Sequence, residues 1–394
     1  MIIKPRIRGF LCTSAHPAGC RADVAAQIAH AQAQDPIEGG PERVLIIGAS
    51  GGYGLASRIV SAFGCGASTL GVFFERPASG NRTASPGWYK SAAFAEAAAE
   101  AGLYARSVNG DAFSAATKQH VAQIIAADFG QVDLVIYSLA APQRELADGS
   151  VARSTLKPIG EPFEGSTIDL NSGEIRQIEL EPATDEEVAD TVTVMGGEDW
   201  QEWIQVLAER GVLAEGAITV NYTYLGSEVT WPIYLNGTIG QAKKDLERAT
   251  GELQSALGVV NGSARLAVMK GLLTQASSAI PGMSLYLSLL FKVMKANGTH
   301  EGCIEQVQRF FATRLFGDDD AADESGRIRM DERELSEENQ AFVRERWEQV
   351  NETNLEELTD FAGYKDAFLK LHGFNFERVD YEADIDPNWP MELA

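Results

Sequence analysis

The chain has 394 residues, of which 45% are hydrophobic, and 33 basic against 56 acidic side chains give it a formal net charge of −23. This charge argues against a nucleic-acid-binding protein, because a phosphate backbone would be repelled, and against binding to an anionic membrane surface. The length suggests two to three domains, and four cysteines in so long a chain do not make a disulfide framework.

The sequence contains no segment typical of targeting, membrane insertion or metal binding. Its start, MIIKPRIRGF, lacks the apolar region of a signal peptide. The longest apolar stretch, near residues 283–294, is too short to span a bilayer. The five histidines are scattered, and none pairs with an acid or a cysteine at ligand spacing. We therefore expect a cytoplasmic protein with no metal and no stable membrane association.

The first 142 residues predict a preface and then an alternation of strands and helices. In the preface, residues 1–43, we expect a short strand at 2–7 and a helix from Pro17 to about Gln34. The stretch 44–54, VLIIGASGGYG, is typical of a buried parallel strand followed by a glycine-rich turn. Alternating helices and strands then follow at residues 55–63, 68–75, 91–101, 104–109, 114–129 and 132–137. This pattern indicates an α/β protein with a Rossmann-type, doubly wound parallel sheet.

Residues 143–215 interrupt the alternation and predict an insertion. Within it we expect a hairpin with a glycine turn at 171–173 and helices at 184–194 and 198–209. The sheet resumes with strands at 217–222 and 264–269, separated by a long helix that ends near Leu257. We thus divide the chain into the preface, a Rossmann core at 44–142 and 216–316, the insertion, and a C-terminal extension at 317–394 packed on the core.

Helices predicted at 283–296 and 301–315 would form a helical lid over the substrate. An apolar face of the first helix would then set which substrate length is accepted; it consists of Leu285, Leu287, Leu290 and Phe291. The alternative for each of these four side chains is ordinary core packing. The C-terminal extension mixes helix with a short extended piece at 376–381.

The glycine-rich turn predicts a site for a phosphate-bearing cofactor. A strand, a turn with Gly48, Gly52 and Gly54, and a helix together present backbone N–H groups and a positive helix end to a phosphate. Glu75, at the end of the second core strand, can accept hydrogen bonds from an adenosine ribose and would repel a 2′-phosphate. This favours NAD(H) over NADP(H), although Arg76 leaves some tolerance of NADPH. The alternative is that Glu75 is an ordinary surface acid.

Tyr234 and Lys243 form a candidate catalytic pair, with eight residues between them. A tyrosine hydroxyl can donate to a developing oxyanion, and a lysine ammonium can support it and hold a nicotinamide ribose. On one helix the two would face opposite sides, but Thr238 and Gln241 fit a capping box, so we expect the helix to start there. Tyr234 would then lie in the preceding loop and point back at Lys243. Lys244 is the adjacent candidate, and an unrelated Tyr and Lys is the alternative.

Tyr224, just beyond the strand at 217–222, is a second candidate hydroxyl for a substrate carbonyl, and its alternative is aromatic packing. These residues together resemble the FabV-type enoyl-acyl-carrier-protein reductases, which merge in sequence with the trans-2-enoyl-CoA reductases. The resemblance is carried by the start MIIKPRIRGFLCTSAHPAGC, the turn GASGGYG, the Tyr234/Lys243 pair and the segment KGLLTQASSAIPGMSLY. It covers essentially the whole chain and implies an enlarged, monomeric short-chain dehydrogenase/reductase.

The resemblance also implies the site and the reaction. Tyr234 would be the proton donor and Tyr224 a substrate contact. NADH would be held by Gly48, Ala49, Ser50, Gly51, Gly52, Tyr53, Phe74, Glu75, Asp111, Ala112, Leu139, Ala140, Lys243, Leu272, Leu273 and Thr274. The implied substrate is a trans-2-enoyl thioester on acyl carrier protein, in the last step of the type II fatty acid elongation cycle. The alternatives are an enoyl-CoA reductase and a non-catalytic NAD-binding sensor.

Overall fold

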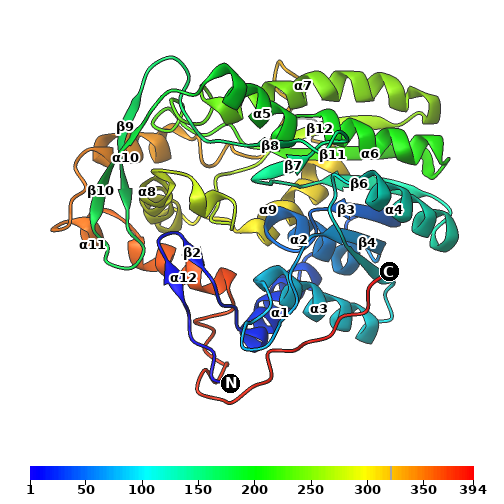
Figure 1. Ribbon diagram of the computed structural model, residues 1–394, viewed down its shortest axis with the longest axis horizontal. Helices are drawn as coiled ribbons and strands as arrows, with labels where there is room; N and C mark the ends of the chain where they lie inside the picture. The colour runs from blue at the N-terminus through cyan, green and yellow to red at the C-terminus, as the bar shows by residue number, and fades with distance from the viewer. Residues whose placement is uncertain (320–321) are drawn as a thin grey trace.

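The computed structural model describes residues 1–319 and 322–394, and its centre is a seven-stranded sheet (Figure 1). The strand order is β13-β12-β11-β6-β3-β4-β5, and every neighbouring pair is parallel. The strands are β3 (Arg43–Ile47), β4 (Ser68–Phe73), β5 (Ala105–Asn109), β6 (Val132–Tyr137), β11 (Leu213–Thr223), β12 (Ser263–Val268) and β13 (Ile328–Arg329). The predicted doubly wound parallel sheet is confirmed.

Helices cover both faces of this sheet, as the alternation of side chains along β3 requires. Val44 and Ile46 belong to one hydrophobic cluster and Leu45 and Ile47 to the other, because successive residues of a strand point to opposite faces. The first face is covered by α1 (Pro17–Gln32), α2 (Gly52–Ile59), α3 (Pro86–Glu100) and α9 (Cys303–Phe310). The second face is covered by α4 (Ala115–Asp128), α6 (Glu198–Glu209) and α7 (Thr238–Ala256).

A third hydrophobic cluster lies beside the sheet, on the left in Figure 1, and joins segments that are far apart in sequence. The insertion contributes the hairpin β9 (Phe163–Ile168) and β10 (Ile175–Leu180). The other elements of this cluster are α8 (Met283–Ala296), α10 (Glu337–Trp347), α11 (Leu355–Leu358) and α12 (Phe361–Leu371). The buried α8 is therefore the element on which the insertion and the C-terminal extension meet.

Two predicted elements sit differently from what the sequence suggested. Helix α6 was assigned to the insertion, but Trp200 and Trp203 of this helix are fully buried in the second core cluster. Helix α9 was assigned to the lid, but its apolar side chains belong to the first core cluster beside α2. In α8, Leu285, Leu287, Leu290 and Phe291 are at most 3% exposed and pack in the third cluster, which agrees with the alternative of core packing. That α8 forms a lid stays a prediction.

The errors in the predicted elements concern short segments. The strand predicted at 2–7 is wrong, because only β1 (Ile7–Arg8) pairs with β2 (Leu11–Cys12). The extended piece predicted at 376–381 forms no strand. Two short elements were not predicted at all, namely the edge strand β13 and the hairpin β7 (Gln143–Glu145) and β8 (Val151–Arg153). Strands of two or three residues carry too little periodicity to be recognised in a sequence.

The two chain ends run over the outside of this architecture. The N-terminal amino group pairs with Asp384. The last residues then pass along α3, where Trp88 Nε1 donates to the Trp389 carbonyl at 2.8 Å. The Ala394 amide finally donates to the Ser107 carbonyl of β5, also at 2.8 Å.

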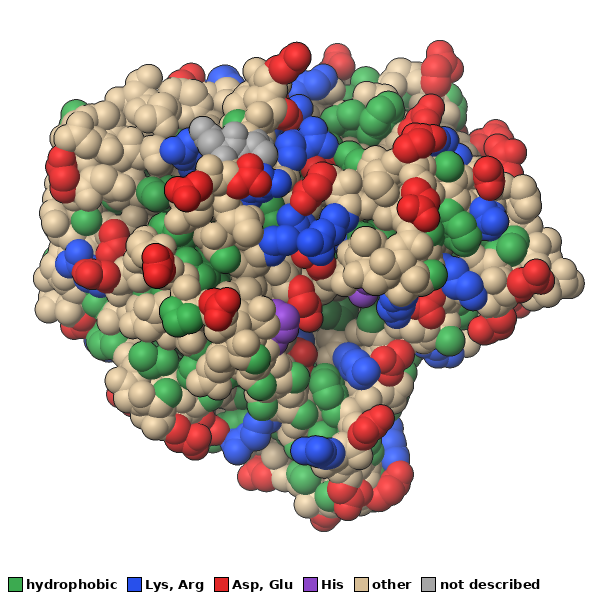
Figure 2. All heavy atoms as spheres, turned by 180° about the vertical axis from the view of Figure 1, so that it is seen from behind, with side chains coloured by type: hydrophobic (Ala, Val, Ile, Leu, Met, Phe, Trp, Pro, Cys, Tyr) green, Lys and Arg blue, Asp and Glu red, His purple; other side chains and the backbone are tan. Residues whose placement is uncertain are grey.

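The surface mixes charges of both signs in spite of the large net charge. Figure 2 shows the molecule from behind, with Lys and Arg side chains gathered near the centre of this face among Asp and Glu side chains. A hollow lies below that centre, with hydrophobic and charged side chains around it. Within the described part of the chain, no helix has the length and apolar character needed to cross a membrane.

Candidate active site at the carboxyl ends of the strands

The glycine-rich turn between β3 and α2 is packed against the end of β6. Gly48 has a φ of 88°, and a Cβ at this position would lie 1.9 Å from the Ser138 carbonyl oxygen. A Cβ on Gly54 would lie 2.0 Å from the Gly48 carbonyl oxygen. The sheet order reverses here, because β3 pairs with β4 on one side and with β6 on the other. Open α/β sheets bind ligands at this crevice, so the turn is a suitable cradle for the pyrophosphate of NADH.

Glu75 is held beside this turn at the end of β4. The Ser50 hydroxyl donates to Glu75 Oε1 at 2.7 Å. The Glu75 backbone N–H donates to Asn109 Oδ1 at 2.7 Å, and Asn109 Nδ2 returns a bond to the Glu75 carbonyl at 2.9 Å. Gly87 leaves the carboxylate its space, since a Cβ there would lie 1.9 Å from Glu75 Oε1. The carboxylate is therefore fixed where the sequence predicts an adenosine ribose.

The other predicted cofactor residues follow the carboxyl ends of parallel strands and so lie along one edge of the sheet. They are Phe74 after β4, Asp111 and Ala112 after β5, Leu139 and Ala140 after β6, and Leu272, Leu273 and Thr274 after β12. The turn and the last group approach each other, because a Cβ on Gly52 would lie 3.4 Å from Thr274 Cγ2. The Tyr53 hydroxyl extends under this edge and donates to the Lys270 carbonyl at 2.8 Å.

Tyr234 lies in a series of turns directly before α7. Its backbone N–H donates to the Thr230 carbonyl, and its own carbonyl accepts from the Gly240 N–H, both at 3.0 Å. The helix begins at Thr238 as predicted, but the capping box is wrong. Gly237 is the N-cap, and the Thr238 hydroxyl donates to the Thr155 carbonyl of the insertion instead.

The Tyr234 ring is 8% exposed and meets the Tyr224 ring edge-on, with the centroids 5.0 Å apart. Burial, with a smaller effect from the Glu334 carboxylate, raises the pKa of the Tyr234 hydroxyl above its ordinary value. The hydroxyl therefore keeps its proton at neutral pH. Within residues 1–319 and 322–394 no protein group accepts a hydrogen bond from it, so its proton remains available to a bound molecule.

Lys243 is half-buried on the second turn of α7, whereas Lys244 is exposed. Burial lowers the pKa of the Lys243 ammonium to about 8. No hydrogen bond joins Lys243 to Tyr234 among the residues that the structure describes. The two residues come from adjoining segments, because Gly240 links the Tyr234 loop to α7 three residues before Lys243. That the pair acts together stays a prediction.

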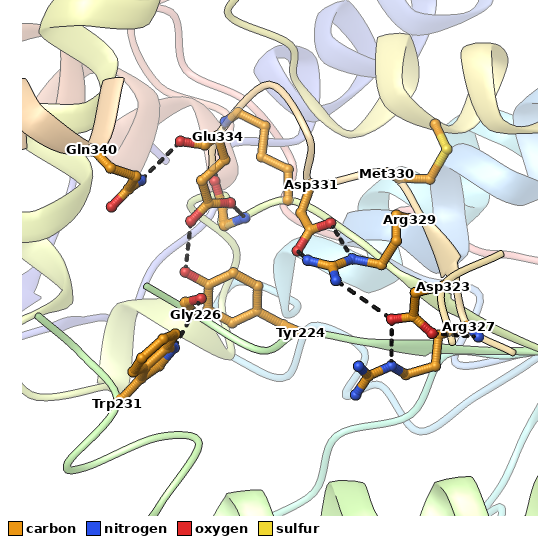
Figure 3. Close-up of polar contacts among 12 residues, drawn as sticks. Tyr224, Gly226, Trp231, Asp323, Arg327, Arg329, Met330, Asp331, Glu334 and Gln340 are labelled. Carbon is orange, nitrogen blue, oxygen red and sulfur yellow. Dashed lines mark hydrogen bonds and ion pairs between the residues drawn. The ribbon is translucent and has the colours of Figure 1, made fainter. Parts of the chain in front are cut away.

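Tyr224 contacts a carboxylate that the sequence did not indicate (Figure 3). Its hydroxyl donates to Glu334 Oε1 at 2.9 Å. The Tyr286 hydroxyl donates to the same oxygen at 2.6 Å. The Gly271 N–H donates to Glu334 Oε2 at 2.6 Å. Glu334 lies in the charged stretch DERE at 331–334, which is typical of a solvated loop, yet the side chain is fully buried. Glu334 reaches the site because it follows β13 closely, and the sequence does not predict this strand.

Three family models match consecutive parts of the chain. Residues 2–80 match the NAD(P)H binding domain of trans-2-enoyl-CoA reductase. Residues 82–316 match the catalytic region of trans-2-enoyl-CoA reductase. Residues 322–385 match a model described as an enoyl reductase FAD binding domain.

The glycine-rich turn after β3 suits NADH, whereas residues 322–385 lack the features expected of an FAD site. Residues 322–385 contain the two-residue strand β13 and the helices α10 to α12, but no strand leading through a glycine-rich turn into a helix. Gly373 there is packed against the preface, since its Cβ would lie 2.4 Å from the His16 carbonyl oxygen. In the described residues no group of three metal-ligating side chains occurs either.

Relatives of known name match the chain over its full length. It is 55% identical, over all of both chains, to the enoyl-[acyl-carrier-protein] reductase [NADH] of Edwardsiella ictaluri and to the FabV enzyme of Aeromonas salmonicida. The trans-2-enoyl-CoA reductase of Clostridium acetobutulicum, solved with NADH, has a TM-score of 0.96 at 41% identity, covering 98% of each chain. That of Treponema denticola, solved with NAD, has a TM-score of 0.92 at 45% identity over both whole chains. The chain therefore belongs to the family of enoyl-acyl-carrier-protein and trans-2-enoyl-CoA reductases.

Proposed function

We propose that this chain reduces the trans-2 double bond of enoyl thioesters carried on acyl carrier protein, with NADH as the hydride donor. The proposal rests on the observation that the predicted cofactor residues lie together at the carboxyl edge of the sheet. There the glycine-rich turn and Glu75 suit NADH, and Tyr234 offers an uncommitted hydroxyl. The 55% identity to NADH-dependent enoyl-acyl-carrier-protein reductases over the whole chain supports the same activity.

The residues have distinct tasks in this reaction. NADH, when bound, supplies the hydride that the β-carbon of the enoyl thioester receives. Negative charge then develops on the thioester oxygen as the substrate becomes an enolate. The Tyr234 hydroxyl donates a hydrogen bond to that oxygen, which stabilises the charge more in the transition state than in the ground state. The Lys243 ammonium supports this hydroxyl electrostatically and holds a ribose. A proton from the Tyr234 hydroxyl, which solvent replaces, reaches the α-carbon and completes the saturation.

The carrier of the acyl chain is the open choice within this family. The first relatives named above act on acyl-carrier-protein substrates, whereas the two solved structures are enoyl-CoA reductases at lower identity. We therefore place the acyl-carrier-protein substrate first. Steady-state turnover on crotonyl-CoA, compared with turnover on enoyl chains of increasing length attached to acyl carrier protein, distinguishes the two. A preference for crotonyl-CoA would overturn our choice.

A sensor that binds NAD without catalysis is the alternative from another class. It would need the turn and Glu75 but not Tyr234. We expect NADH absorbance at 340 nm to fall only when an enoyl thioester is added. Constant absorbance with every enoyl thioester, in the presence of tight NADH binding, would favour the sensor.

We further propose that the protein is a cytoplasmic monomer without membrane association, organised as the preface, core, insertion and extension described above. The absence of a membrane-spanning helix in the described residues is compatible with this. Helix α8 is the remaining candidate for a lid, because it lies beside the segment that follows β12. Substituting Leu290 by a smaller residue and measuring turnover against acyl length tests whether α8 selects the chain.

A further inference from the structure

The C-terminal extension places a fully buried carboxylate against the candidate active site. Glu334 is 0% exposed and accepts three hydrogen bonds, two from the hydroxyls of Tyr224 and Tyr286 and one from the Gly271 backbone. An isolated carboxylate at such a position would be strongly disfavoured. Because one of the three donors, Tyr224, is a candidate substrate contact, we ask what Glu334 contributes to the reaction.

The donors around Glu334 suit its ionised form. The Gly271 N–H can only donate, and both tyrosine hydroxyls lie at hydrogen-bonding distance from one oxygen. Burial raises the pKa of Glu334, and the positive charge of Lys270 together with these donors opposes that rise. Lys270 is itself only 1% exposed, and its ammonium donates to the Gly271 carbonyl at 3.0 Å. No ion pair joins Lys270 to Glu334 in the described residues, so the carboxylate is stabilised by its three donors and, from a greater distance, by the positive charge of Lys270.

The segment that carries Glu334 is held rigidly. Gln340 Nε2 donates to the Glu334 carbonyl at 2.8 Å, and Gln306 Nε2 donates to the Met330 carbonyl at 3.1 Å. Asp331 forms an ion pair with Arg329 at 2.7 Å (Figure 3). Gly271 leaves no free space, because a Cβ there would lie 2.8 Å from the Tyr224 hydroxyl oxygen. The Tyr224 hydroxyl thus has one defined position.

This arrangement separates the roles of the two tyrosines. The Tyr224 hydroxyl gives its hydrogen to Glu334, whereas the Tyr234 hydroxyl has no protein acceptor among the described residues. The two rings are in edge-on contact at 5.0 Å, so a fixed Tyr224 also fixes the position of Tyr234. Of these two hydroxyls, that of Tyr234 then remains to donate to the substrate oxygen.

We propose that Glu334 is a positioning residue for the reductase reaction, acting through Tyr224: by accepting the Tyr224 hydroxyl hydrogen it fixes the Tyr224 ring against Tyr234, and it leaves the Tyr234 hydroxyl as the donor to the substrate oxygen. This inference rests on the proposed function, since it concerns the same reaction. It assigns to the C-terminal extension a part in the active site, in place of a flavin.

A double-mutant cycle tests the inference. Glu334→Gln keeps the size of the side chain but removes its charge and one acceptor. We expect kcat to fall about 10- to 100-fold, because small displacements of a reacting group have effects of this size. The KM for the enoyl thioester and the Kd for NADH should change less than about 3-fold. In a Tyr224→Phe background, the same substitution should lower kcat by no more than about 2-fold, because contacting residues are coupled.

Two further variants keep the test decisive. Asp133→Asn is the matched control, a carboxylate-to-amide change at the amino end of β6, the opposite edge of the sheet, where Asp133 accepts the backbone N–H groups of Glu42 and Arg43. It should leave kcat within about 2-fold. If Glu334→Gln does not fold, Glu334→Asp keeps the charge and shortens the side chain, and should show the same dependence on Tyr224. Equal losses in kcat with and without the Tyr224 hydroxyl, or a loss in Asp133→Asn as large as in Glu334→Gln, would overturn the inference. Absence of enoyl-dependent NADH oxidation in the unmodified chain would instead reject the proposed function.

Discussion

Replacing Tyr234 by Phe removes one oxygen atom from the site and little else. The ring remains in contact with Tyr224, and the hydroxyl gives no hydrogen bond to any group in the described parts of the chain. We therefore expect the free energy of unfolding to change by less than about 0.5 kcal/mol. Loss of a donor to a developing oxyanion raises the barrier by about 3–4 kcal/mol, so kcat should fall about 100- to 1,000-fold. The Kd for NADH should hardly change.

The assay combines stopped-flow or steady-state NADH oxidation with denaturant unfolding of the same preparation. Tyr224→Phe is the matched comparison, because its hydroxyl donates to the buried, charged Glu334. That variant should lose about 1.5–3 kcal/mol of stability, the usual value for a hydrogen bond to a charged group. Near-normal turnover in Tyr234→Phe would refute the donor role. A loss of stability equal to that of Tyr224→Phe would refute our account of its free hydroxyl.

Three other predictions follow from the same geometry. The Lys243 ammonium has a pKa lowered to about 8, so it is a cation below that pH and neutral above it. The affinity for NADH, measured by fluorescence, should therefore decrease as the pH rises from 7 to 9. A Lys243→Met variant should bind NADH weakly at every pH in this range. Glu75→Ala removes an acceptor for the ribose, so the Kd for NADH should rise about 10-fold, which corresponds to about 1.5 kcal/mol of binding free energy. The affinity for NADPH should increase relative to that for NADH. An unchanged cofactor preference would identify Glu75 as a surface acid. Gly271→Ala introduces a Cβ 2.8 Å from the Tyr224 hydroxyl oxygen, so it should lower the free energy of unfolding by about 1–3 kcal/mol and also lower turnover. Gly251→Ala, which has open space around it on α7, should be neutral or stabilising. Equal stability of the two variants would contradict the crowding at Gly271.

The parts of the fold that the sequence predicts are those with strong local signals. Four apolar residues before a glycine-rich turn define β3, and a segment of six residues, apolar except for Asp133, defines β6. The start of α7 is also predicted, although for the wrong reason: Thr238 serves the insertion, and Gly237 caps the helix. The local sequence predicts that the Thr238 hydroxyl caps its own helix, but in the folded protein it bonds to the Thr155 carbonyl of the insertion instead.

The site divides in the same way. Residues at the ends of parallel strands could be predicted to lie together, because topology alone brings the carboxyl ends of such strands to one edge. Glu334 could not be predicted, since a carboxylate in a charged stretch has the pattern of a surface residue until its burial is known. Its partners come from the residue that follows β11, from the segment after β12 and from α8, and no local pattern links these segments.

The route of the last residues also bears on the exposed edges of the sheet. A parallel sheet leaves two edge strands with unpaired backbone groups, which can recruit a strand from another molecule. One edge here is β13, which is only two residues long, and the other is β5, where the terminal Ala394 bonds to the Ser107 carbonyl. Ala394 thus covers part of the β5 edge, so we expect a chain shortened by its final residues to lose solubility before it loses activity.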